Sequence, residues 1–260
     1  MVIVLEGNIG VGKTTALHML TKYYPSEFHC CPEPIQEWTN GNNKLAQFYA
    51  NPKDRAFLFQ LECLLRMDNS SQPIDKTIIQ ERSILSTYYI FSLIHLQRRN
   101  ITEEQFGILT KLFSRLIKES GIKAVVYLQV PHSFAHERVM ARGRIEEVNI
   151  DVSYLADLER AHDDLFITKA TALNIPVLVL DGTGLTRLIV DTIRAFTRVT
   201  ECGPLLAPPM LEFDHEQQKW ENTNKLCPIE KQLIEASGPS IVQHAKLTTS
   251  GCHHYDWNPR

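Results

Sequence analysis

The sequence predicts an α/β protein in three layers, with helices on both faces of a five-stranded parallel sheet. Short apolar runs alternate with helical segments over the first 200 residues, and strands separated by helices are typical of parallel sheets. Two runs, 123–130 and 176–180, are apolar over most of their length, as expected of strands covered on both faces. The expected strands are 2–6, 27–31, 76–80, 123–130 and 176–180.

Eight helices are expected between and after these strands. They fall at 13–23, 43–50, 53–69, 84–98, 102–120, 132–143, 152–172 and 184–199. In an open parallel sheet, ligands bind at the carboxyl ends of the strands. The residues that follow each strand are therefore the first candidates for a functional site.

Composition makes several classes of partner improbable. The 260 residues are 43% apolar, enough for a hydrophobic core, and the formal net charge is −3. This charge gives no global basic field for a nucleic-acid or membrane partner. No apolar run approaches the ~20 residues of a membrane-spanning helix. The six cysteines show no C-x-x-C spacing and no signal peptide precedes the first strand, so a reducing, cytoplasmic location is expected.

The character of the sequence changes after residue 200. Gly-Pro at 203–204 and Ala-Pro-Pro at 207–209 break any helix. Beyond them the chain is polar, with one weak amphipathic stretch at 229–236. We expect a domain at 1–200 and a largely flexible extension at 201–260.

A phosphate-binding loop directly follows the first strand. Residues 7–14 read Gly-Asn-Ile-Gly-Val-Gly-Lys-Thr, which fits G-x-x-x-x-G-K-[ST]. In such a loop, backbone N–H groups converge on phosphates, the lysine reaches the β- and γ-phosphates and the hydroxyl holds Mg²⁺. The strand before it and the helix after it favour a P-loop NTPase over a glycine-rich turn without a ligand. The residues expected at the nucleotide are Gly7, Asn8, Ile9, Gly10, Val11, Gly12, Lys13, Thr14 and Thr15.

An acidic residue follows the second strand. Glu33 lies between Pro32 and Pro34, which restrict its backbone. Opposite the phosphate loop, Glu33 would accept a proton from an attacking hydroxyl. The alternative is an ordinary acidic residue in a turn.

The third strand ends in an acid and an arginine, Glu81 and Arg82. A carboxylate at this strand end is where an NTPase of this kind holds Mg²⁺, so Thr14 and Glu81 are the expected metal ligands. Arg82 would neutralise charge on a transferring phosphoryl group. The alternative is a surface ion pair.

Three arginines surround Gly143 after the fourth strand. Arg138 and Arg142 are four residues apart and share a helix face, and Arg144 follows. This cluster favours a helical lid that closes on phosphates. A solvated basic helix end is the alternative.

Aromatic residues and one glutamine mark an acceptor pocket. Phe59 and Gln60 lie in the expected helix 53–69, and Phe91 lies in the next long one. A glutamine can bond the edge of a base and an aromatic ring can stack on its face. The alternative is that these aromatic residues only fill the core.

Together these motifs resemble the deoxynucleoside kinase family over about residues 1–200. The stretch from Glu33 to Trp38 resembles the family's E-P-x-x-x-W. This implies that Glu33 is the general base on the nucleoside 5′-hydroxyl and that Trp38 lines the sugar and base pocket. Tyr49 precedes Gln60 by eleven residues, as in the family, where the tyrosine contacts the 3′-hydroxyl and the glutamine reads the base. Phe59 precedes the glutamine in the same pattern.

Residues 81–83 resemble the family's E-R-S. The implied roles are metal binding and acid catalysis for Glu81, and contact with phosphate and the 5′-oxygen for Arg82. Phe91 matches the phenylalanine that stacks on the base. The family's lid is matched by Arg138, Arg142 and Arg144 and, as the acid that reaches the sugar, Glu147.

The base pocket departs from one branch of the family. Deoxycytidine kinase has an Arg–Asp pair there, whereas the matching residues here are Met67 and Thr87, with Cys63 nearby. Met67 resembles the methionine of the insect and thymidine-preferring members. An uncharged pocket has room for a thymine methyl group, so we expect thymidine and deoxycytidine as best acceptors, with broad tolerance.

The resemblance therefore implies ATP-dependent phosphorylation of the 5′-hydroxyl of deoxyribonucleosides, with Mg²⁺, by a homodimer. The nearest alternative is a nucleoside monophosphate kinase of thymidylate kinase type, which shares the loop and an arginine lid. A non-catalytic, nucleotide-binding regulatory protein is a third hypothesis. The complete set of acids, arginines and lid residues argues against it.

Overall fold

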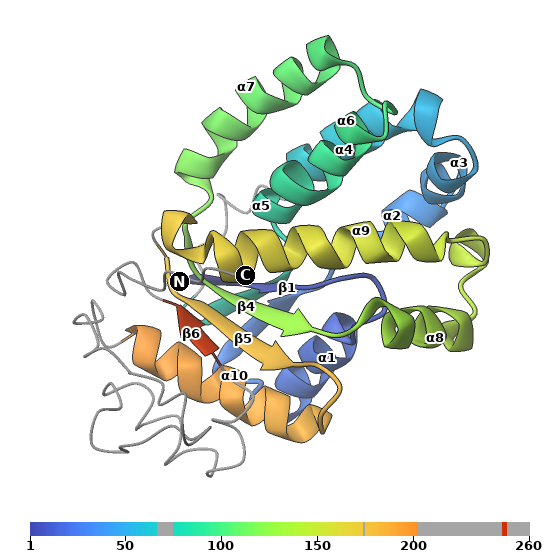
Figure 1. Cartoon of the computed structure of the whole chain (residues 1–260). Helices are drawn as coiled ribbons and strands as arrows, with labels where there is room; N and C mark the ends of the chain where they lie inside the picture. The colour runs from blue at the N-terminus through green and yellow to red at the C-terminus, as the bar shows by residue number, and fades with distance from the viewer. Residues whose placement is uncertain (67–74, 174, 202–245, 249–260) are drawn as a thin grey trace, which may run out of the picture.

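A computed structural model describes residues 1–66, 75–173, 175–201 and 246–248. The sheet lies between two helical layers (Figure 1). Helices α1 (Lys13–Tyr23) and α10 (Thr186–Glu201) cover one face. The helices between β2 and β4, together with α9, cover the other face, and α8 lies beyond the carboxyl ends of the strands. The predicted three-layer α/β/α fold is confirmed.

The five predicted parallel strands are all present. The sheet order is β2-β3-β1-β4-β5-β6, and the first five strands run parallel. Because β1 lies between β3 and β4, its carboxyl end has neighbouring strand ends on both sides. The strands are β1 Val2–Glu6, β2 Phe28–Cys31, β3 Thr77–Glu81, β4 Ile122–Gln129, β5 Val177–Asp181 and β6 Lys246–Thr248.

Strand β6 was not predicted. It pairs antiparallel with β5, with Thr248 opposite Val177 and Lys246 opposite Val179. Three residues are too few to show the alternation that marks a strand in sequence. Glu201, the first residue of the expected extension, ends α10. Residues 202–245 and 249–260, including 229–236, lie outside the described residues, so their predicted flexibility stays a prediction.

The helices largely follow the predicted ranges and differ from them mainly in where they begin and end. Two long predicted helices are, in addition, interrupted by π-helical segments. The segment expected at 84–98 is divided by the π-helix η1, where the Ser92 hydroxyl donates to the carbonyl oxygen of Thr87, five residues back, at 2.7 Å. The segment expected at 152–172 passes into the π-helix η3 after Asp163. The remaining helical segments are α2 Ile35–Thr39, α3 Lys44–Ala50, α4 Pro52–Arg66, α5 Ile84–Ser86, η1 Thr87–Ser92, α6 Leu93–Gln97, α7 Glu103–Glu119, α8 His132–Arg142, η2 Ile145–Glu147, α9 Val152–Asp163, η3 Asp164–Thr168 and η4 Ala170–Leu173.

The short helix α2 also was not predicted. It begins after Pro34, whose φ of −78° is close to the value a helix needs. The helix turns Trp38 into the core, where it is 2% exposed. None of the described helices is long and apolar enough to cross a lipid bilayer.

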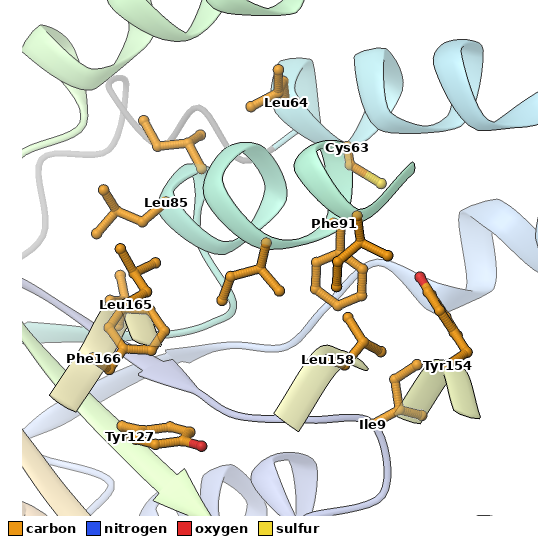
Figure 2. Packing of buried hydrophobic residues seen from close by; sticks show 14 of the residues in the cluster. Ile9, Cys63, Leu64, Leu85, Phe91, Tyr127, Tyr154, Leu158, Leu165 and Phe166 are labelled. Carbon is orange, nitrogen blue, oxygen red and sulfur yellow. The ribbon is translucent and has the colours of Figure 1, made fainter. Parts of the chain in front are cut away.

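Two histidines are buried in the core without charge. His162 is fully buried beside Tyr127 and Phe166, and Figure 2 shows these two rings packed above β4. Burial lowers the pKa of His162 to about 3 and that of His95 to about 4. Both side chains are therefore neutral in the folded protein at neutral pH.

We predict that acid destabilises the protein through these histidines. An unfolded histidine titrates near 6.5, so between pH 6.5 and 4 the unfolded state binds more protons and the free energy of unfolding falls. In His162→Phe, the loss of unfolding free energy between pH 7.5 and 5 should be smaller by about 2 kcal/mol. Urea unfolding at both pH values measures this. The exposed His29→Phe is the matched control, and an equal loss in wild type and His162→Phe would contradict the prediction.

Candidate active site

The phosphate loop connects β1 to α1 and depends on glycine geometry. Gly10 has φ +82°, and a Cβ there would lie 2.5 Å from the carbonyl oxygen of Ala135 in α8. Gly12 has φ +101° and precedes the first turn of α1. Both conformations are unfavourable for a residue with a side chain. The loop therefore packs against α8 while the N-terminus of α1 points toward the expected phosphates.

The lysine and threonine of the loop are already held by hydrogen bonds. Lys13 Nζ donates to the carbonyl oxygens of Gly7 at 3.0 Å and Asn8 at 2.7 Å. Burial, with the nearby charge of Arg82, lowers the pKa of Lys13 to about 8. Thr14 Oγ1 donates to the Glu81 carboxylate at 2.9 and 3.0 Å. The two predicted metal ligands thus lie side by side, where a hard cation would find oxygen ligands.

A buried ion pair joins the ends of β2 and β3. Arg82 Nε is 2.9 Å from Glu33 Oε1, and their side chains are 6% and 16% exposed. Arg82 has a left-handed backbone, φ +65°, and its guanidinium lies 4.5 Å from the ring centroid of Phe91. The predicted base and the predicted phosphate ligand are therefore in direct contact, at the point where the loop meets the aromatic residues.

Aromatic rings form one side of the adjoining pocket. Phe59 stacks on Phe48, with centroids 4.6 Å apart and 15° between the planes, and packs edge-on against Trp38 at 5.2 Å. Figure 2 shows Phe91 below Cys63, with Tyr154 beside it. Flat walls of this kind suit a planar ring.

The end of this pocket that is predicted to receive a base is lined by polar groups without charge. Gln60 is 2% exposed, and no described side chain bonds its amide. The indole nitrogen of Trp38 is also buried without a partner among the described residues. Burial raises the pKa of the Cys63 thiol well above its usual value, so it is neutral. Thr87 Oγ1 bonds the carbonyl oxygen of Ser83 at 3.0 Å, and Met67 lies outside the described residues.

The lid arginines do not act as one group. Arg142 and Arg144 both pair with the Glu147 carboxylate, which is 3% exposed, and Arg144 Nη1 is 2.7 Å from Oε1. Arg138 instead donates to the carbonyl oxygens of Val11 and Gly182, each at 3.1 Å. Arg138 therefore braces the phosphate loop against the turn after β5, which the sequence did not indicate.

One cavity of about 750 Å³ connects the phosphate loop with the aromatic pocket. Every described residue predicted for the site lines this cavity except Gly7 and Asn8. The Asn8 amide instead donates to the carbonyl oxygen of Leu155 in α9 at 2.8 Å, which anchors the loop. Their roles toward ligands stay predictions.

The cavity also has walls that were not predicted. These walls include Ile35, Leu45, Phe48 and Tyr154 at the aromatic end, and His18, Gly182, Gly184 and Thr186 at the loop end. Leu45 and Phe48 share a helix face, close to Tyr49, so helical spacing could have indicated them. Tyr154 enters from α9, and no local pattern in the sequence points to it.

This arrangement is that of a P-loop kinase, in which a triphosphate and a phosphoryl acceptor meet in one cavity. Comparison with known proteins supplies the family. A sequence model described as "Deoxynucleoside kinase" matches residues 3–200. The chain belongs to the deoxynucleoside kinase family, whose members are enzymes that phosphorylate deoxynucleosides.

Curated relatives in this family carry several different names. The chain is 30% identical to deoxycytidine kinase 2 of Gallus gallus, over 68% of this chain and 80% of that one. It is also 30% identical to the mitochondrial deoxyguanosine kinase of Xenopus laevis, over 68% and 79%. Its identity to the mitochondrial thymidine kinase 2 of Homo sapiens is 28%, over 70% of each chain. These names differ in the nucleoside, so the relatives alone do not assign one.

We predict that Gly10→Ala weakens nucleotide binding. The added Cβ would meet the carbonyl oxygen of Ala135 at a positive φ, so the loop and α8 must separate. ATP affinity measured by calorimetry should fall at least tenfold. Gly107→Ala is the matched control, because nothing lies within 4 Å of its Cβ and alanine in a helix should raise stability by about 0.5–1 kcal/mol. Unchanged ATP affinity in Gly10→Ala would contradict the prediction.

Proposed function

We propose that this enzyme transfers the γ-phosphoryl group of ATP to the 5′-hydroxyl of deoxyribonucleosides, with thymidine and deoxycytidine as best acceptors. The observation that carries the proposal is the ion pair between Glu33 and Arg82. This pair lies where the phosphate loop meets the aromatic pocket. A sugar hydroxyl bound at this point would face Glu33 as the general base and Arg82 as a cation. Proximity of this kind supplies much of the catalysis in phosphoryl transfer.

The donor half of the reaction rests on the loop. Lys13 would exchange the carbonyl oxygens of Gly7 and Asn8 for the β- and γ-phosphates. Arg142 and Arg144 would exchange Glu147 for phosphate oxygens. Charge that develops on the transferring group would then meet fixed cations in a site with little water.

The proposed magnesium site rests on Thr14 and Glu81. A hydroxyl and a carboxylate within 3.0 Å of each other fit Mg²⁺, which prefers one or two such ligands together with phosphates and water. Bound there, Mg²⁺ would neutralise charge on the phosphates.

The acceptor half rests on Glu33 as general base. Its carboxylate would take the 5′-hydroxyl proton as the oxygen attacks, while Arg82 remains beside the same oxygen. Phe91 and Phe59 would hold the base, and Gln60 would bond its edge. Tyr49 and the released Glu147 would bond the 3′-hydroxyl of the sugar.

The proposed preference rests on Cys63 and Thr87, which place no charge at the base end of the described pocket. A neutral wall leaves room for the methyl group of thymine. It also lacks a charged pair that would fix cytosine or a purine in one orientation.

We also propose a homodimer in the cytoplasm. Leu58 and Leu65, seven residues apart on α4, are 57% and 55% exposed, and Ile108 on α7 is 51% exposed. Such apolar positions favour contact with a second copy.

The described cysteines are free thiols, in keeping with a reducing compartment. The net charge of −3 gives no support for a nucleic-acid partner.

A substrate panel tests the proposed function. Purified protein with ATP and Mg²⁺ should phosphorylate thymidine and deoxycytidine with higher kcat/KM than deoxyadenosine and deoxyguanosine. Turnover should be absent with thymidine monophosphate. Activity on the monophosphate but not on thymidine would favour the thymidylate kinase type instead, and no turnover on any nucleoside would overturn the proposal.

Replacing the base should separate chemistry from binding. Glu33→Gln should lower kcat by roughly 10²–10⁴-fold while the ATP dissociation constant changes less than threefold. Because Glu33 also pairs with buried Arg82, the melting temperature is measured alongside. The control is Glu37→Gln, four residues further along in α2, whose exposed partner is Arg66, and it should keep wild-type kinetics. Wild-type turnover in Glu33→Gln would remove Glu33 as the base.

A further inference from the structure

A fully buried carboxylate lies behind the site, and the proposed reaction does not use it. Glu6 is the last residue of β1 and is 0% exposed. It does not line the cavity, and its burial leaves no surface for either proposed substrate to contact. A buried carboxyl group is costly unless it has partners, and burial raises the pKa of Glu6 to about 7.

The partners of Glu6 are two hydroxyl groups that follow β3. Its Oε1 accepts hydrogen bonds from Ser83 Oγ at 2.5 Å and from Ser86 Oγ at 3.0 Å. Its Oε2 is buried and has no partner among the described residues. One oxygen atom thus ties the end of β1 to the start of α5.

These two serines shape the turn that carries Arg82. Ser83 Oγ accepts from the backbone N–H of Leu85 at 3.1 Å, and the N–H of Ser83 donates to Ser86 Oγ at 3.4 Å. This reciprocal cap begins α5 directly after Arg82. The backbone N–H of Arg82 donates to the carbonyl oxygen of Leu5 at 3.0 Å, so the turn is fixed on both sides by the end of β1.

Arg82 needs such support for two reasons. Its φ of +65° is unfavourable for an arginine, and a conformation of this kind persists only where the surroundings impose it. The same turn directs the guanidinium toward Glu33 and over Phe91. A small rotation of the turn would move the guanidinium away from both.

We propose that Glu6 is a positioning residue for phosphoryl transfer: through Ser83 and Ser86 it holds the Arg82 turn so that the guanidinium meets the reacting oxygens. The inference rests on the proposed kinase function. It assigns Glu6 an effect on the rate of the chemical step rather than on the binding of ATP or nucleoside.

The decisive comparison is between two equally buried serines in neighbouring turns. Ser86→Ala removes a hydroxyl that bonds Glu6 and the backbone of Ser83. Ser92→Ala removes a hydroxyl whose one bond within the described part of the chain is to the carbonyl oxygen of Thr87. Ser86→Ala should lower kcat about tenfold, with both KM values changed less than twofold. Ser92→Ala should keep kcat within twofold of wild type. Equal kcat values in the two variants would overturn the proposal, even if both lose thermal stability.

Two substitutions at Glu6 test whether its hydrogen bonds to the serines maintain the rate. Glu6→Gln keeps an oxygen that accepts from both serines and should retain kcat within about threefold. Glu6→Leu cannot accept and should lose at least 30-fold. A Gln variant as slow as the Leu variant would overturn the assignment of hydrogen bonding. If Glu6→Leu does not fold, the serine comparison still decides.

A double-mutant cycle tests whether the effect passes through Arg82. On an Arg82→Lys background, Ser86→Ala should lower kcat less than twofold further, because the group it positions is gone. A full tenfold loss on that background would show that Ser86 acts elsewhere and would overturn the proposal.

Wild-type protein is assayed first. Its failure to phosphorylate any nucleoside would overturn the proposed function and this inference together, whereas an active wild type with an unaffected Ser86→Ala would overturn this inference alone.

Discussion

The burial of one guanidinium, that of Arg82, is the constraint on which the site depends. A buried cation is stable only beside groups that compensate its charge. Here Glu33 pairs with it, Glu6 and Glu81 add negative charge nearby, and Phe91 offers the face of its ring. These four residues come from four separate segments of the chain. The need to neutralise Arg82 therefore brings together the ends of three strands and one helix, and a cavity for two substrates results.

Several charged and hydroxyl groups of the site bond one another or the carbonyl groups of the loop. Lys13 bonds loop carbonyl groups, Thr14 bonds Glu81, and the lid arginines bond Glu147. In the proposed reaction a triphosphate would replace these contacts with stronger ones, so part of its binding free energy would be spent on the exchange. In the proposed reaction this exchange would also link the two substrates, because the Glu147 carboxylate would become free for the sugar only when Arg142 and Arg144 turn to phosphate.

Most of the fold could be predicted because its signals are local: apolar runs mark the strands, and one glycine-rich loop marks the phosphate site. Glu33 and Glu81 could be placed together because parallel strands end at one edge of a sheet. The choice of partner for each arginine could not be predicted, because Arg138 meets backbone carbonyl groups that only the folded chain brings near it. Tyr154 and the three-residue strand β6 left no pattern to detect.

Strand β6 has a consequence that is separate from catalysis. It occupies the hydrogen-bonding groups on the outer side of β5 at Val177 and Val179, where the sheet would otherwise present an open edge. An open edge is a template on which a strand of another molecule can add. A shortened chain that ended after α10 would keep every residue of the cavity yet expose that template. The far end of the sequence thus bears on whether copies of this protein, in whatever assembly, add to one another edge to edge in a crowded solution.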